Sequence, residues 1–266
     1  MNLQNHFSAS RFYKYLKYDL VLNGKTYLFA FIGLILVLVL IHFFTISTAS
    51  YRVNFKNNYY NPIFFFTLIG GIVISAGTSF PSLRTSQKSI NYLLLPASIL
   101  EKVIVQALFR IIAFIILFIP LYWMSFKIAY GFYGLFEWQN FIEVAPIGLF
   151  DFYRGTPSLL DVLAIIFSII SLASFLFAGA VYFKKHAVFK SVLAFGILVF
   201  MWFLLMVLFS HIFYPDSSGD FFDIKIQEYK INEELHASQL FTYIFGMASS
   251  LFLLPLAYFK LKEKEV

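Results

Sequence analysis

Three polar side chains recur at four-residue intervals within an otherwise apolar stretch. Lys102, Gln106 and Arg110 fall on one helical face, because residues four apart lie one turn above each other. If the helix starts at Ser98, Arg110 stands about 18 Å beyond that start. One interpretation is an intramembrane cation that faces a cavity or an acidic partner group. The other, which we favour, is that Arg110 extends toward lipid headgroups because its helix begins outside the membrane.

A helix start is marked just before this polar stripe. Ser98 and Glu101 have the S-x-x-E spacing of a capping box, in which each side chain bonds to the other residue's backbone N–H. Pro96 precedes them and ends any earlier helix. Between Pro81 and Pro96 there is room for a short separate helix. The sequence therefore predicts a structured loop with one short helix, followed by a long helix from Ser98.

The chain lacks the motifs of familiar catalytic and cofactor sites. It has no G-x-x-x-x-G-K-[ST] phosphate loop, no G-x-G-x-x-G sequence, no G-x-S-x-G elbow and no cysteine. Its histidines are scattered and form no H-E-x-x-H pair. No acidic residue falls firmly inside an apolar stretch, so the sequence offers no proton relay. We predict no catalytic residue, no cofactor and no metal site in this chain.

The composition indicates that this chain is an integral membrane protein. Of its 266 residues, 60% are hydrophobic and only 13% are charged, whereas soluble domains carry about a quarter charged residues. This excludes a soluble enzyme, a disordered chain and a nucleic-acid-binding module. Six stretches have the roughly 20 apolar residues that a membrane span requires. They are Thr26–Thr48, Pro62–Phe80, Val103–Phe126, Leu159–Phe183, Val192–Phe213 and Leu240–Phe259.

The distribution of charge predicts the side of the membrane on which each loop lies. With the N-terminus in the cytoplasm, the inner side holds 14 basic and 4 acidic residues, and the outer side 6 basic and 10 acidic. This asymmetry follows the positive-inside rule. The sequence therefore predicts an all-α membrane protein with six transmembrane helices and both termini cytoplasmic. Residues 1–25 would form a cytoplasmic N-terminus, and residues 26–266 one transmembrane domain.

Several segments between the spans have features of their own. Ser8–Leu22 has a basic and an apolar face, which predicts either an amphipathic helix in the membrane interface or an ordinary basic flank. The outer loop 127–158 is aromatic and reads as an interface-lying segment. The outer loop 214–239 is acidic, which favours a solvated loop over a cation or basic-ligand site. Small residues four apart allow close helix packing, within one chain or between two. These pairs are Gly71–Ser75, Ser174–Ala178 and Gly246–Ser250.

The order of these elements resembles the membrane subunit of type 2 ABC exporters. The stretch from Tyr92 to Lys102, YLLLPASILEK, looks like the YL.LPAS..EK pattern of ABC permeases from Bacteroidota. This resemblance implies a multi-pass protein of a bacterial inner membrane. It also implies a second permease copy or a paralogue, with a substrate path between the two. ATP and Mg²⁺ would be held by a separate cytoplasmic ATPase subunit, so this chain would not itself be an enzyme.

The resemblance also assigns roles to two segments. Residues 82–96 would be the coupling helix that docks on the ATPase, and Ser8–Leu22 would be the connecting helix. The implied docking residues are Arg84, Lys88, Ile90, Tyr92, Leu93 and Leu94. A membrane scaffold or assembly factor without a transport role is the alternative, and an intramembrane enzyme has the least support.

Overall fold

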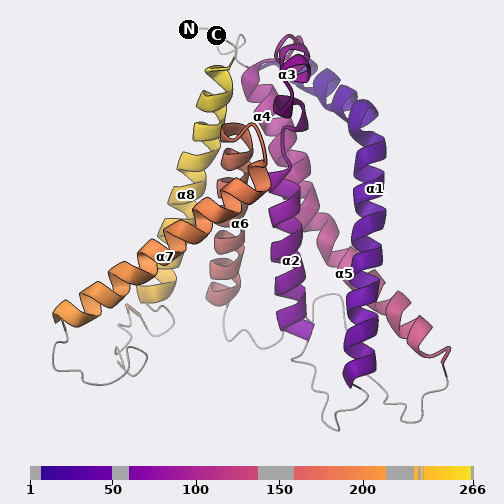
Figure 1. Cartoon of the computed structure of the whole chain (residues 1–266), viewed down its shortest axis with the longest axis vertical. Helices are drawn as coiled ribbons and strands as arrows, with labels where there is room; N and C mark the ends of the chain where they lie inside the picture. The colour runs from indigo at the N-terminus through magenta and orange to yellow at the C-terminus, as the bar shows by residue number, and fades with distance from the viewer. Residues whose placement is uncertain are drawn as a thin grey trace. The chain divides into compact units, whose positions relative to one another are not determined.

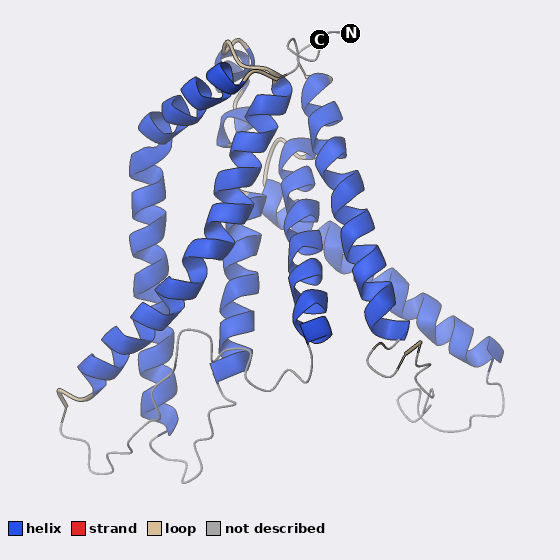
Figure 2. Cartoon of the chain, turned by 180° about the vertical axis from the view of Figure 1, so that it is seen from behind, coloured by secondary structure: helices blue, strands red, loops and turns tan. Residues whose placement is uncertain are grey.

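The computed structural model describes residues 7–49, 60–136, 159–213, 231–232, 235 and 237–264. Every regular element in these ranges is a helix, as Figure 2 shows. The α-helices are α1 (Ala9–Ala49), α2 (Tyr60–Gly77), α3 (Ser86–Leu93), α4 (Ile99–Ala107), α5 (Phe114–Tyr133), α6 (Leu159–Tyr182), α7 (Ala187–Phe213) and α8 (Ala237–Lys262). A 3₁₀-helix, η3 (Pro81–Arg84), precedes α3, and a π-helix, η4 (Leu108–Ala113), joins α4 to α5.

Five helical stretches are long and apolar enough to cross a membrane. They are Ala9–Thr48, Ile99–Tyr133, Leu160–Tyr182, Ala187–Phe209 and Leu240–Lys262. The expected second span, Pro62–Phe80, corresponds to a shorter apolar helix that ends at Gly77. Phe80 has a left-handed backbone with a φ of 54°, and Pro81 follows it, so the chain turns away after α2. The structure confirms an all-helical, multi-pass membrane protein.

Two expected boundaries are wrong because neighbouring helices run on without a break. The segment Ser8–Leu22 and the span Thr26–Thr48 form a single 41-residue helix, α1, instead of two elements. Figure 1 shows that α1 bends near its N-terminal end. The helix of the third span starts where Ser98 predicts but runs past the expected end at Phe126, because α4, η4 and α5 continue end to end over 35 residues, from Ile99 to Tyr133. At about 1.5 Å per residue, both helices are longer than a hydrocarbon core of about 30 Å.

The chain divides into two compact units, each with its own packing. The first comprises residues 1–76 and 90–156, and the second residues 77–89 and 157–266. In the first unit, α1 packs against α4 and α5. Its core is aromatic, with the His42 ring edge-on to Tyr122, 4.6 Å between centroids. Ile46 is fully buried in a cluster with Phe126 and Tyr133.

In the second unit, α6 packs against both α7 and α8. Small residues make these contacts close. A Cβ added at Gly246 of α8 would lie 2.8 Å from the Cβ of Phe167, and one added at Gly179 would lie 2.1 Å from the Ser191 hydroxyl. The predicted stripes of small residues on the fourth and sixth spans thus include residues that pack helices of one chain. Of the predicted aromatic loop 127–158 and the predicted acidic loop 214–239, residues 137–158, 214–230, 233–234 and 236 lie outside the described residues.

Candidate functional site

A short helix lies between Pro81 and Pro96, as the prolines and the room between them predict. It consists of η3 followed by the eight-residue α3. Two apolar side chains at its far end are open, since Ile90 is 56% and Leu94 76% exposed. The cationic side chains of Arg84 and Lys88 are exposed as well. We use the term exposed face of α3 for four exposed side chains of this segment, which are Arg84 at the end of η3, Lys88 and Ile90 in α3, and Leu94 directly after it. They combine cations with uncovered apolar area.

The other two expected docking residues turn inward. Tyr92 is only 7% exposed and lies near Tyr15 of α1, which is buried as well. Burial raises the pKa of Tyr92 well above its usual value, so the hydroxyl keeps its proton. The Leu93 side chain is half-buried, and its carbonyl accepts a hydrogen bond of 2.8 Å from the Nζ of Lys102. Tyr92 and Leu93 therefore anchor α3 instead of forming its open surface.

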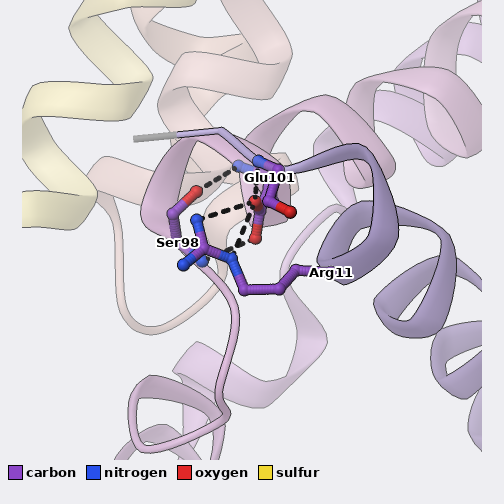
Figure 3. A network of polar contacts seen from close by, with 4 residues as sticks. Arg11, Ser98 and Glu101 are labelled. Carbon is purple, nitrogen blue, oxygen red and sulfur yellow. Dashed lines mark hydrogen bonds and ion pairs between the residues drawn. The ribbon is translucent and has the colours of Figure 1, made fainter. Parts of the chain in front are cut away.

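Glu101 joins the beginnings of α1 and α4, as Figure 3 shows. Its carboxylate is fully buried and accepts backbone N–H groups of Ser98 and Ser8, both at 2.8 Å. The Ser98 hydroxyl accepts the Glu101 N–H at 3.2 Å, so the predicted capping box is present. The Arg11 guanidinium completes the group with an ion pair of 3.2 Å. One carboxylate thus caps α4 and also fixes the start of α1.

Asp19 is the centre of a second polar node, a group of hydrogen bonds that lies further along the same two helices. Only 4% of it is exposed. One carboxylate oxygen accepts from the Asn23 amide at 2.9 Å and from the Gln106 amide at 3.2 Å. The other oxygen accepts the Tyr27 hydroxyl at 2.7 Å. Three side chains from α1 and α4 are therefore held around one buried carboxylate.

Arg110 lies next to this second node. Its guanidinium is over the Tyr27 ring, 5.1 Å from the centroid, and is half-buried. Its backbone carbonyl, inside the π-helix η4, accepts the Ser75 hydroxyl of α2 at 2.7 Å. π-Helices widen the backbone ring, and they are frequent at functional positions. Tyr27 lies between Arg110 and Asp19, because its ring faces the guanidinium and its hydroxyl donates to Asp19. Both interpretations of Arg110 stay predictions.

Two polar stripes therefore face each other along α1 and α4. The stripe of α4 was predicted from Lys102, Gln106 and Arg110. The stripe of α1 was missed, because the segment was interpreted by its apolar face and its exposed cations. A four-residue repeat marks it in the sequence and supplies the signal that could have found it. Its members are Arg11, Tyr15, Asp19, Asn23 and Tyr27.

The arrangement joins helices through partly or fully buried polar contacts. Within the described ranges, no three histidine or acidic side chains gather as metal ligands would. The polar side chains of both stripes are engaged with each other or with the backbone, and they link α3, α4 and α1 into one assembly. No protein-family model, no curated protein and no solved structure matches this chain.

Proposed function

We propose that this chain is the permease subunit of an ATP-binding cassette exporter, with six spans and both termini in the cytoplasm. A separate cytoplasmic ATPase would supply ATP hydrolysis, and a second permease copy or paralogue would complete the substrate path. The observation that carries the proposal is the exposed face of α3. A short helical segment that exposes Ile90 and Leu94 as well as Lys88 suits a protein partner outside the membrane.

The inward side of α3 supports a coupling role. Movement of α3 would act on Lys102 of α4 through its hydrogen bond to the carbonyl of Leu93, and the buried Tyr92 would move with α3 near Tyr15 of α1. Because the two stripes join α1 to α4 at Glu101 and again at Asp19, the two helices would move as one body. A partner that displaces α3 could therefore shift two membrane-spanning helices at once.

The test is binding of an ATPase encoded by a neighbouring reading frame. We expect the full-length chain to co-purify with that ATPase. The double variant Ile90→Asp, Leu94→Asp should reduce the amount of co-purified ATPase by at least about tenfold, because apolar contacts of the interface are lost. Charge reversal by Arg84→Glu and Lys88→Glu should weaken ATPase binding and lower the rate of ATP hydrolysis by the complex.

The matched control is Lys14→Glu with Lys17→Glu, which makes the same charge change at exposed positions of α1. It should leave ATPase binding intact. If no ATPase binds, or if both charge reversals act equally, the docking role of α3 fails. Binding of another membrane partner through 214–239, without any effect of ATP, would favour the scaffold alternative.

A further inference from the structure

A group of lysines converges at one end of the second unit. We call Lys184, Lys185, Lys190, Lys260 and Lys264 the lysine cluster. Lys184 and Lys185 lie in the turn between α6 and α7, and Lys190 lies in the first turn of α7. Lys260 lies in the last turn of α8, and Lys264 follows the end of that helix. Lys264 donates from Nζ to the carbonyl of Val181, which brings the end of α8 against the end of α6.

The charge of this cluster is only partly compensated among the described residues. Lys260 forms an ion pair with Glu263. Burial lowers the pKa of Lys264, and the neighbouring cations Lys184 and Lys260 lower it further. The positive end of the α7 helix dipole lies next to Lys184 and Lys185, because α7 begins at Ala187. An anion placed here would relieve repulsion among the lysines.

The surroundings of the cluster are apolar and open. Tyr182 is 57%, Phe189 70% and Phe259 60% exposed. The Lys260 ammonium lies 5.4 Å from the Tyr182 ring centroid, and the Lys190 ammonium lies 5.9 Å from that of Phe183. Exposed aromatic rings beside lysines at a helix end are typical of the membrane–water interface. From this end, α7 buries Ala187 and Ser191, and its most apolar 18-residue stretch has no buried residue.

We propose that the lysine cluster binds the phosphate headgroup of an anionic phospholipid, with the acyl chains along α7. Cations, a helix N-terminus and interfacial rings recognise the headgroup, and the uncovered length of α7 receives the chains. A soluble phosphate would use the cations alone, and an acidic protein segment would leave the apolar side of α7 uncovered. The site does not depend on the exporter proposal.

The test measures lipid binding to the full-length chain by native mass spectrometry in detergent. Phosphatidylglycerol is compared with phosphatidylcholine of the same acyl chains. Wild-type protein should retain phosphatidylglycerol preferentially. The variant Lys184→Gln, Lys185→Gln, Lys190→Gln should lose at least about tenfold in that binding, since each lysine near an anionic headgroup contributes several-fold in affinity. These three side chains are exposed, so circular dichroism should show unchanged helicity.

Two further variants separate a site from diffuse attraction. Lys14→Gln, Lys17→Gln, Lys88→Gln removes the same charge at exposed positions of the first 88 residues and should retain phosphatidylglycerol. Arginine at positions 184, 185 and 190 should retain it too. Equal losses in both glutamine triples would overturn the proposal, as would equal retention of the two lipids by wild type. Displacement of phosphatidylglycerol by excess inorganic phosphate would also overturn it, because the site would then take a soluble anion.

Discussion

Glu101 bonds to two helices, because it caps α4 and also contacts the start of α1. A capping-box glutamate ordinarily satisfies one backbone donor, but this one accepts the N–H groups of both Ser98 and Ser8. Its buried carboxylate would leave those donors without an acceptor if it were removed. Arg11, in contrast, keeps 40% of its side chain exposed, so solvent screens its contribution to the ion pair.

The two partners of this ion pair should therefore differ in their effect on stability. Glu101→Ala should lower the free energy of unfolding by about 2–4 kcal/mol, because buried backbone donors lose their acceptor. Arg11→Ala should cost less than about 1 kcal/mol. Glu101→Gln should fall between the two, since glutamine retains the cap. SDS-induced unfolding in detergent measures all three, and equal losses for Arg11→Ala and Glu101→Ala would contradict this account.

Asp19 offers a second prediction at the same scale. Asp19→Ala would leave the donors of Asn23, Tyr27 and Gln106 without their common acceptor in a buried place. We expect a loss of about 2–3 kcal/mol and a lower thermal unfolding temperature. The control is Lys17→Ala, two residues earlier and exposed, which should change stability by less than about 0.5 kcal/mol. A near-neutral Asp19→Ala would show that the node is not structural.

Contacts between helices depend on where glycine allows close approach. Gly246 and Gly196 are both helical, but they differ in surroundings. A Cβ at Gly246 would lie 3.1 Å from the Phe167 carbonyl oxygen as well as against its Cβ, whereas a Cβ at Gly196 meets nothing within 4 Å. The first glycine fits α8 to α6, and the second lies on the open side of α7.

Alanine at the two positions should have opposite effects. Gly246→Ala should destabilise by about 1–3 kcal/mol, because the Phe167 backbone cannot move aside cheaply. Gly196→Ala should stabilise by up to about 1 kcal/mol, since alanine favours the helix and meets no neighbour. Thermal unfolding of both variants in one detergent makes the comparison. Destabilisation by Gly196→Ala would show that α7 is covered by another helix at that point.

Much of the helical layout was predictable, and the failures have physical causes. Apolar runs indicate spans, because a helix that crosses a bilayer must present apolar side chains to lipid. Ser98 and Glu101 mark the start of α4 through their capping-box spacing. The continuity of α1 was not readable, because polar residues such as Asp19 and Asn23 interrupt its hydropathy. Only their partners on α4 show why they are buried in a helix. The inward turn of Tyr92 likewise depends on Tyr15, which is distant in sequence.

At the scale of the molecule, the number of spans decides where the ends of the chain lie. Six crossings place residues 14 and 262 on the same side of the membrane, and five would place them on opposite sides. The difference depends on α2, whose 18 residues reach about 27 Å, close to the thickness of the hydrocarbon core.

The absence of cysteine from the sequence allows a direct measurement of this topology. Lys14→Cys, Lys88→Cys and Lys262→Cys should all react with a membrane-impermeant maleimide only after the inner side is exposed. Asp223→Cys should react from the outside in intact cells. Outside labelling of both Lys88→Cys and Lys262→Cys would contradict six spans, because it would show that α2 does not cross the membrane before residue 88.

The π-helix η4 has a consequence for the length of the long helix that contains it. A π-turn accommodates one residue more than an α-turn between the same two flanks. The helix from Ile99 to Tyr133 thus carries a surplus residue near Arg110. Deleting one residue within Leu108–Ala113 would convert the turn to α-helix while leaving Glu101 and Tyr122 in their present rotational phase. The protein thereby holds a position where the chain could be shortened without turning either end of the helix.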